Sequence, residues 1–364
     1  MTAKERVIAA LEQRPTDRPP IFPVVTFEPL IKVMGKTLAD AWIDPRLMYD
    51  ALYAGWETFG FDGFEIPVWG YKKRDWVEED GILYLLNEDG SKKYYFTDPN
   101  QNPVKVDRTK RVMSYEEILG RPIKTCDELL AEGNFEQARE LVSKIDGRAF
   151  LTGHSADQTF NSLVGCRGAE NALMDPFDEP ELVHRAFEHF TLQSIEKAKA
   201  FKEIGMDGIY IGDAWSSCSC ISPDIFEEFC VPYYRMAADA IHEMGLKACL
   251  HICGNTTPIL EMMAATGVDS LEPLDPLGGV KLEDVKGRLG GTVGLKGGIN
   301  TLTVLNGTVQ QVVEETQSCL DLMGTVPGYI FSAGDDIPPH SSIENIMAMC
   351  DTVRNYRNPL YDGI

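Results

Sequence analysis

Residues 247–254 read KACLHICG, a short apolar run that ends in polar residues and lies between two helical patterns. The run predicts a β-strand, in which successive side chains point to opposite faces. One face then carries Cys249, His251 and Cys253, and the apolar residues between them occupy the other face. The pattern therefore predicts a histidine and a cysteine side by side near the carboxyl end of a strand.

The same arrangement recurs along the chain, with further strands expected at 148–155, 206–215, 268–274, 291–299 and 329–336. Helical patterns alternate with these strands at 126–145, 177–204, 222–245, 256–266, 281–288, 308–322 and about 341–356. Such alternation favours a parallel sheet. Because polar residues follow so many of the strands, we predict an α/β fold closed into a (β/α)8 TIM barrel, with its site at the carboxyl ends of the strands. An open doubly wound sheet is the weaker alternative, since no GxGxxG follows a first strand.

The first 125 residues follow a different pattern. A helix is expected at 3–13, and it is followed by an extended run at 21–27, a helical pattern at 37–60 and a strand at 61–69. The stretch GILYLLNEDGSKKYYF (81–96) predicts a β-hairpin, because two β-prone runs flank the turn residues NEDG. We interpret residues 1–364 as a single barrel domain, in which residues 1–125 include a helical and β-hairpin cap.

Composition argues against some classes of function. The chain has 364 residues, of which 44% are hydrophobic, and a formal net charge of −22. Such a surface repels phosphate backbones and anionic lipids, so we expect neither nucleic-acid nor membrane binding. No apolar segment approaches the roughly 20 residues of a membrane span, and the charged amphipathic start differs from a secretory signal. The nine cysteines follow no disulfide-scaffold spacing and are expected to be reduced thiols of a cytoplasmic protein.

His251 and Cys253 can each supply one bond to Zn²⁺, which accepts imidazole nitrogen and thiolate sulfur. Two buried core residues are the alternative, since cysteine often packs as a small hydrophobic residue. Carboxylates at the ends of other strands favour the site, namely Asp213 in IGDAW, Glu272 in SLEPLD and Asp335 with Asp336 in FSAGDD. Each carboxylate could instead cap a helix or a turn.

Several segments together carry a family resemblance. They are HICGNTTPIL with the following GVDSLEPLDP, the opening AKERVIAALEQRPTDRPPIFP, ISPDIFEEFCVPYYRMAADAIHEMG (221–245) and FSAGDDIPPHSSIENIMAM. Over nearly the whole chain they resemble the uroporphyrinogen decarboxylase superfamily. Within it the chain is most similar to the zinc-dependent, corrinoid-linked methyltransferases, which include methylcobamide:coenzyme M methyltransferases and methyltransferase components of bacterial O-demethylases. The decarboxylases have an arginine-rich segment where this chain reads FPVVTFEPLIKV (22–33), without arginine.

The resemblance implies a zinc site. His251 and Cys253 match the family's His-x-Cys ligands, and Asp335 stands where the family usually has a third ligand, a cysteine. Three interpretations are open: Asp335 binds zinc through oxygen, Glu272 or a cysteine of SSCSC (216–220) replaces it, or the metal has been lost. A carboxylate in place of a thiolate would leave a harder, more Lewis-acidic zinc, suited to polarising an ether or hydroxyl oxygen.

The expected function is zinc-dependent transfer of a methyl group between a small molecule, such as a methoxylated aromatic or a thiol, and the cobalt of a corrinoid (cobalamin). We expect Asp213 and Glu272 to be catalytic, and His154, Asn255 and Asp336 to bind substrate. The chain has no DxHxxG signature, so the corrinoid would come on a partner protein or as free cofactor. A metal-free decarboxylase acting on a carboxylated tetrapyrrole and a non-catalytic binding barrel are the alternatives, and homodimer formation is left open.

Overall fold

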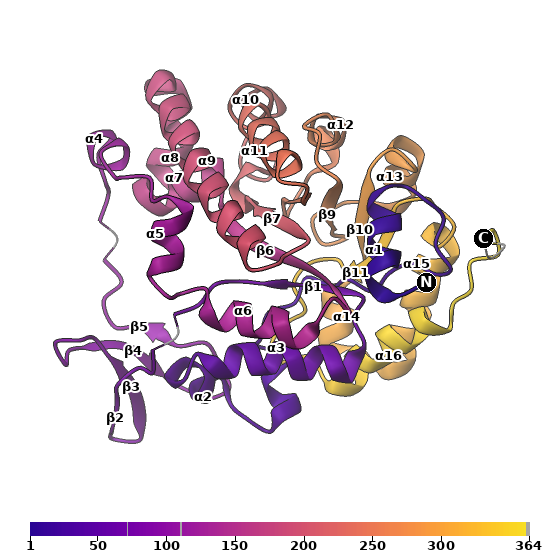
Figure 1. Cartoon of the computed structure of the whole chain (residues 1–364), viewed down its shortest axis with the longest axis horizontal. Helices are drawn as coiled ribbons and strands as arrows, with labels where there is room; N and C mark the ends of the chain where they lie inside the picture. The colour runs from indigo at the N-terminus through magenta and orange to yellow at the C-terminus, as the bar shows by residue number, and fades with distance from the viewer. Residues whose placement is uncertain (71, 110, 362–364) are drawn as a thin grey trace.

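The computed structural model describes residues 1–70, 72–109 and 111–361, apart from the side chains of residues 156 and 157. Its centre is a parallel sheet of seven strands: β1 (Gly63–Ile66), β6 (Phe150–Asp157), β7 (Gly208–Gly212), β8 (Lys247–His251), β9 (Ser270–Leu274), β10 (Gly294–Ile299) and β11 (Tyr329–Ala333). The strands lie in the sheet in their order in the sequence, and the sheet curls with helices on its outer side (Figure 1). The α/β class and the alternation of strands and helices are thus confirmed.

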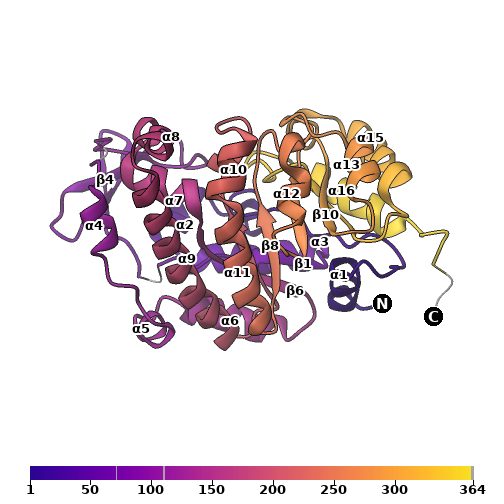
Figure 2. The same ribbon diagram turned by 90° about the horizontal axis from the view of Figure 1, so that it is seen from above.

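Helices connect the strands and cover the outer face of the sheet (Figure 2). They are α5 (Cys126–Ala131), α6 (Glu136–Ile145), α7 (Thr159–Arg167), α8 (Ala169–Asp178), α9 (Pro180–Glu203), α10 (Pro223–Phe229), α11 (Val231–Glu243), α12 (Leu260–Ala264), α13 (Leu282–Leu289), α14 (Thr301–Asn306), α15 (Val309–Met323) and α16 (Ile343–Asn355). The expected helix at 222–245 is interrupted at Cys230, just before Pro232. The sequence patterns do not predict the helices α7, α8 and α14. Two of them give weak local signals, since α7 lacks an amphipathic period and α14 has six residues. Among the helices in the described part of the chain, none is long and apolar enough to cross a membrane.

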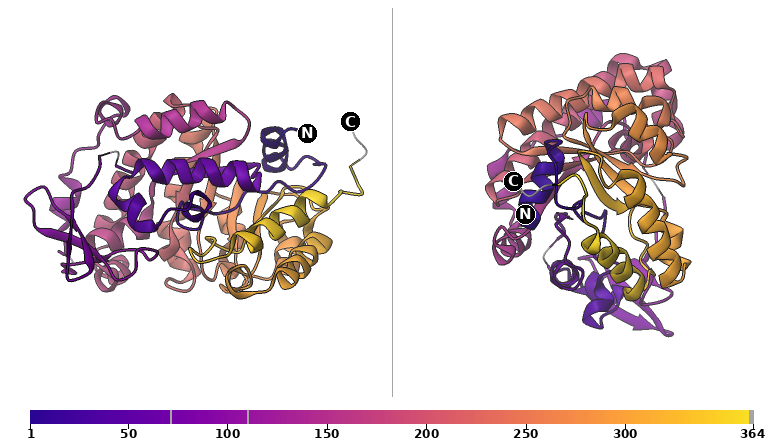
Figure 3. Two further views of the ribbon diagram at one scale, coloured as in Figure 1. Left: turned by 90° about the horizontal axis from the view of Figure 1, so that it is seen from below. Right: turned by 90° about the vertical axis from the view of Figure 1, so that its right-hand side faces the viewer.

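The N-terminal residues form smaller elements. These are α1 (Ala3–Leu11), the 3₁₀ helix η1 (Ile31–Met34), α2 (Leu38–Ile43), α3 (Arg46–Phe59), α4 (Tyr115–Leu119) and an antiparallel sheet of β2 (Trp76–Glu79), β3 (Ile82–Leu86), β4 (Lys92–Phe96) and β5 (Val104–Lys105). The small sheet lies at one end of the molecule, away from the seven strands (Figure 3). The expected hairpin is confirmed, since Asn87 N–H donates to Ser91 O where β3 turns into β4.

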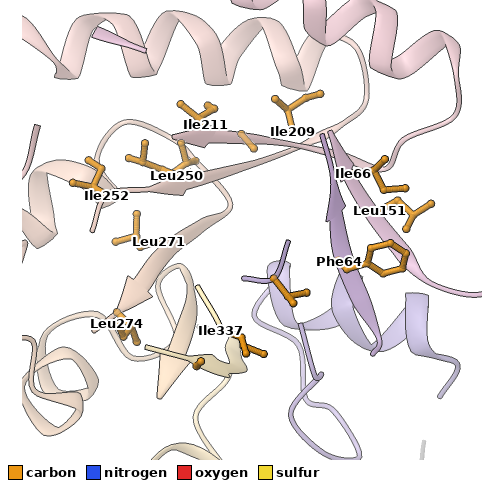
Figure 4. Packing of buried hydrophobic residues seen from close by; sticks show 14 of the residues in the cluster. Phe64, Ile66, Leu151, Ile209, Ile211, Leu250, Ile252, Leu271, Leu274 and Ile337 are labelled. Atoms are coloured by element: carbon orange, nitrogen blue, oxygen red, sulfur yellow. The ribbon is translucent and has the colours of Figure 1, made fainter. Parts of the chain in front are cut away.

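The interior of the parallel sheet is apolar at the amino ends of its strands. Phe22, Phe150, Cys249 and Ile330 form a buried cluster there with Val7, Ala10 and Leu11 of α1. The start of α1 is fixed by a capping box between Thr2 and Glu5. On the outer face, Ile209, Ile211 and Leu250 belong to the main hydrophobic core (Figure 4). Since the amino end of the sheet interior is filled by apolar side chains, the carboxyl ends of the strands are left for inward polar side chains.

Ile21 lies between the two edge strands of the sheet. It forms a parallel bridge with Phe331 of β11. Its carbonyl accepts hydrogen bonds from the N–H groups of Asp62 (2.7 Å) and Gly63 (3.3 Å) at the start of β1. The Asp62 carboxylate in turn accepts a hydrogen bond from Ile21 N–H at 2.7 Å. Of the extended run expected at 21–27, this single bridge joins the sheet.

Candidate functional site

The carboxyl end of the sheet interior is polar. Six neighbouring strands each contribute one inward side chain, and we call these residues the inner polar layer: Glu65, His154, Tyr210, His251, Glu272 and Lys296. Their strand neighbours Ile66, Ile209, Leu250 and Leu271 belong to the hydrophobic core (Figure 4). Because successive strand residues alternate, these apolar side chains lie on the opposite face of the sheet. Strand period and register thus bring residues far apart in the sequence into contact.

His251 is the centre of the inner polar layer. Its side chain is 8% exposed and each ring nitrogen faces a carboxylate: Nδ1 lies 3.5 Å from Glu272 Oε1, and Nε2 lies 3.5 Å from Asp335 Oδ1. Burial acts to lower the pKa of His251, but the Cys253 and Glu272 side chains and the charge of Asp335 overcome this effect and raise the pKa to about 10. An imidazole in these surroundings attracts positive charge, either as a proton or as a metal ion.

Glu272 is held by a buried lysine. Lys296 Nζ lies 2.8 Å from Glu272 Oε2, and both side chains are almost fully buried. Burial acts to raise the pKa of Glu272, but the charge of Lys296 and the contact with His251 outweigh it, so the pKa is lowered. Lys296 Nζ also lies 3.9 Å from the centre of the Phe22 ring, which is cation–π geometry. Glu272 is therefore an ionised carboxylate between Lys296 and His251.

Asp335 and Asp336 follow β11 at the same end of the sheet. Asp336 is exposed to solvent. Protein atoms nevertheless crowd its carboxyl group. The resulting desolvation raises the pKa of Asp336 to about 7, against the opposing charge of His251. The carboxylates of Glu65, Asp335 and Glu28 add to the rise. The carboxyl end of the sheet is thus strongly acidic.

His154 and Tyr210 extend the inner polar layer towards β1. His154 Nδ1 lies 2.8 Å from Glu65 Oε1. The Tyr210 ring lies beside both imidazoles, with its centroid 4.7 Å from that of His154 and 5.1 Å from that of His251. Burial, followed by the charges of nearby carboxylates, raises the pKa of Tyr210 well above its ordinary value. The phenol is therefore protonated near neutral pH.

Asp213 and Asn255 make different contacts. The buried Asp213 carboxylate accepts hydrogen bonds from the Tyr234 hydroxyl (2.9 Å) and from Asn161 N–H (2.8 Å). Asn255 Oδ1 accepts a hydrogen bond from Thr257 N–H at 3.2 Å and shapes the turn after β8. Both side chains thus support loop structure, and their catalytic and substrate-binding roles stay predictions.

The donor set can be compared with what zinc requires. Two ligands of one tetrahedral zinc lie roughly 3.4 Å apart, and His251 Nε2 and Asp335 Oδ1 are 3.5 Å apart. Cys253 is half-buried and interacts with the His251 imidazole. Within the described residues, however, no three His, Cys, Asp or Glu side chains converge closely enough to hold a metal ion. The residues fit zinc in kind, and one pair of them fits it in spacing.

Glu65, Tyr210 and Lys296 belong to the inner polar layer but escape a prediction that looks for site residues where strands end. All three lie inside strands, in the segments GFEI, GIYIG and GLKGGI. The strand period of two is the signal that would have found them, since it places each on the inward face.

Comparison with known proteins agrees with the resemblance predicted from the motifs. The model of the family described as uroporphyrinogen decarboxylase (URO-D) matches residues 133–356. A methylcobamide:CoM methyltransferase of Methanosarcina mazei is 25% identical, over 98% of this chain and 98% of that protein. A uroporphyrinogen decarboxylase of Anaeromyxobacter dehalogenans is 24% identical, over 96% of this chain and 98% of that protein.

The fold also has a solved counterpart. A methyltransferase structure from Methanosarcina mazei superposes with a TM-score of 0.75 at 22% identity, covering 97% of this chain and 98% of that one. The family model matches more than half of the residues, and we conclude that the chain belongs to the uroporphyrinogen decarboxylase family.

Proposed function

We propose that this protein is an enzyme that transfers a methyl group between the heteroatom of a small molecule and the cobalt of a corrinoid. The observation that carries the proposal is the buried His251 between Glu272 and Asp335 at the carboxyl end of the sheet. A relative that matches nearly the full length is named a methylcobamide:CoM methyltransferase. The corrinoid would be carried by a partner protein or would bind as free cofactor.

The metal that we propose for the site is zinc, with His251, Cys253 and Asp335 as its ligands. Their nitrogen, sulfur and oxygen donors are all of kinds that zinc accepts. Bound there, zinc would supply Lewis acidity towards the heteroatom that carries or receives the methyl group. To complete the set, the half-buried Cys253 would turn towards the His251–Asp335 pair.

Glu272 and Lys296 are proposed to act through His251. A carboxylate behind one ring nitrogen fixes the tautomer in which the other nitrogen is free to bind a metal. Glu272 Oε1 faces Nδ1, which leaves Nε2 directed towards Asp335. The Lys296 ammonium keeps Glu272 ionised. In this proposal Glu272 orients the histidine and does not itself touch the substrate.

The charge at the carboxyl end of the sheet favours an uncharged substrate. Glu28, Glu65 and Asp335 all act on Asp336, and such a cluster repels a tetrapyrrole that carries many carboxylates. Glu28 lies in the segment 22–33, where the decarboxylases carry arginine. We therefore propose methoxylated aromatics as methyl donors, with His154 and Asp336 beside them, in preference to a decarboxylase reaction.

We propose in addition that the sheet closes into a (β/α)8 TIM barrel and that the chain is one domain with an N-terminal cap. The stretch around Ile21 would take the eighth place, because it bridges to β11 and bonds to the start of β1. With the amino end filled by the cluster around α1, the corrinoid would reach His251 from the carboxyl end.

Metal analysis tests the ligand set. We expect the purified wild-type protein to contain stoichiometric zinc, and Asp335→Ala and Cys253→Ala to lose most of it. Cys126→Ala is a matched control, because Cys126 is also half-buried but lies at the start of α5 and should not affect zinc content. Unchanged zinc in Asp335→Ala would remove that residue from the set, and a zinc-free wild type would contradict the metal proposal.

Methyl transfer itself is tested with free cobalamin. The protein is incubated with cob(I)alamin and separate methoxyaromatics and methylamines, or with methylcobalamin and thiols, while the cobalamin spectrum is recorded. We expect at least one methoxyaromatic to yield methylcobalamin. If no compound yields or consumes methylcobalamin, the proposal fails and a non-catalytic barrel gains support. Release of CO₂ from a carboxylated tetrapyrrole would support the lyase.

A further inference from the structure

Tyr210 is buried at the carboxyl end of the sheet and its hydroxyl makes no hydrogen bond to any described residue. The residue is 8% exposed, and the hydroxyl is unpaired without being fully enclosed. Other interior tyrosines differ, since Tyr234 donates to Asp213 and Tyr329 donates to Gly297 O, each at 2.9 Å. Tyr210 thus holds an unused donor among the site residues.

The direction of the Tyr210 side chain follows from β7. Ile209 and Ile211 point outward (Figure 4), so Tyr210 points inward. A Cβ atom placed on Gly212 would lie 2.9 Å from Tyr210 Cε1 and 3.6 Å from its hydroxyl oxygen. The ring therefore runs along β7 towards the carboxyl end of the strand, and Gly212 leaves room for it. The hydroxyl is aimed at the end of the sheet where Asp335 follows β11.

An unused donor in this position has a cost. A fully buried polar group without a partner costs roughly 1–3 kcal/mol, and this is an upper limit for the Tyr210 hydroxyl, which is not fully enclosed. The large majority of buried side-chain polar atoms in native structures are paired. Phenylalanine would fill the same space beside His154 and His251 without this cost. The hydroxyl therefore points to a ligand that accepts its hydrogen bond.

We propose that Tyr210 is a catalytic residue that donates a hydrogen bond to the methyl-bearing oxygen of a methoxylated aromatic, a role that rests on the function proposed above. In demethylation the C–O bond breaks and its electron pair stays on the oxygen. The two electrons of the new Co–C bond come from the cobalt of a cob(I)amide. The Tyr210 hydroxyl stabilises the negative charge that develops on the oxygen, and the product phenoxide then takes a proton from water.

The surrounding carboxylates favour such a donor beside the proposed zinc, and they help to select the class of substrate. Glu65 and Asp335 would oppose a new negative charge on a leaving oxygen, and Tyr210 supplies an uncharged donor beside them. A thiolate that attacks a methylated cobalt would gain nothing from such a donor, because a hydrogen bond to sulfur makes it less nucleophilic. Tyr210 therefore favours oxygen-linked methyl donors over thiol acceptors.

The substitution Tyr210→Phe tests the role, because it removes the hydroxyl and keeps the ring. With cob(I)alamin and 2-methoxyphenol we expect kcat to fall about 100-fold, as when one donor to a developing oxyanion is lost, with little change in KM. The loss should shrink to about a few-fold for nitro-substituted methoxyaromatics, whose leaving oxygen needs less stabilisation. Zinc content should equal that of the wild type, and the temperature of thermal unfolding should be the same or higher, since no hydrogen bond to a described residue is lost and the unpaired hydroxyl is removed.

Tyr233→Phe is the matched control. Its hydroxyl donates to His184 O at 2.9 Å in the outer helical layer, so the variant should keep the wild-type kcat. Equal losses for all leaving groups in Tyr210→Phe, or no loss, would overturn the role of Tyr210. A wild-type protein that methylates only thiols would overturn this role alone, whereas one that moves no methyl group would overturn the proposed function as well.

Discussion

Lys296 and Glu272 form an ion pair in the interior of the sheet, with 3% and 0% of their side chains exposed. Removal of one partner of a buried pair leaves an uncompensated charge, which costs about 3–5 kcal/mol. We therefore expect Lys296→Met to lower the free energy of unfolding by about that amount, measured by urea denaturation.

Two further variants make this prediction specific. Lys247 pairs with Asp269 at 3.0 Å, but 26% of its side chain is exposed, so Lys247→Met should cost less than about 1 kcal/mol. In the double variant Lys296→Met with Glu272→Gln, the second change removes the orphaned charge and should restore part of the stability. Costs that simply add would contradict the coupling of the two residues.

The sequence carries part of the site at the level of single residues. His251, Glu272 and Asp335 could be predicted to lie together, because each lies close to the carboxyl end of a strand of one parallel sheet. Lys296 could not, because lysine is almost never fully buried unless it is paired, and its partner is known only once β9 and β10 are neighbours. Asp213 also ends a strand, as predicted, but its carboxylate is used by the nearby donors of Tyr234 and Asn161.

At the scale of elements, α1 is fastened to the sheet by a charged network. Arg6 donates to Asp17 Oδ1 and Asp62 Oδ1, both at 2.6 Å, and Arg18 donates to Asp62 Oδ2 at 2.7 Å. Asp62 also accepts the hydrogen bond from Ile21 N–H. The network thus joins α1 and the stretch around Ile21 to the start of β1.

The network predicts how acid destabilises the protein. Burial acts to raise the pKa of Asp17, but its hydrogen bonds and charge contact with Arg6 lower the pKa to about 2. A carboxyl group whose pKa is lower in the folded state adds stability above its unfolded pKa of about 3.9 and loses that stability as the pH falls towards 2. Asp17→Asn should therefore be less stable than the wild type at neutral pH and should lose less stability between about pH 4 and pH 2.

Denaturation midpoints measured across this pH range check the prediction. Asp321→Asn is a control, because Asp321 lies in α15 and accepts a hydrogen bond from Gln317 on the same helix. If the stability of Asp17→Asn falls as steeply between about pH 4 and pH 2 as that of the wild type, the assigned role of Arg6 is contradicted.

The sequence predicts most elements of the sheet because apolar runs and turn residues are local signals. It overestimates helix length where proline or glycine follows, as at Pro232. It misses α7, whose nine residues show no amphipathic period and which depends on contacts such as those of Thr159 with Asp213 and Tyr234. These contacts form between residues more than fifty positions apart, so local patterns cannot reveal them.

At the scale of the whole molecule, the parallel sheet separates an apolar end, filled by α1, from an acidic end that carries the inner polar layer. The alternation of strands and helices predicts this polarity. The place of Ile21 between β1 and β11 is a long-range pairing without a sequence signal. The excess of 56 acidic over 34 basic side chains makes a partner with a basic surface the better match for docking.

The central claim is that His251 organises methyl transfer at the acidic end of the sheet. The most direct test compares the rate at which the wild type and His251→Ala methylate cob(I)alamin from a methoxyaromatic. His242→Ala serves as control, because His242 lies on α11, is 40% exposed and pairs with Asp269. We predict that the wild type and His242→Ala form methylcobalamin at equal rates and that His251→Ala is slower by about 100-fold or more. Equal rates in all three proteins, or no methylcobalamin from the wild type, would contradict the claim.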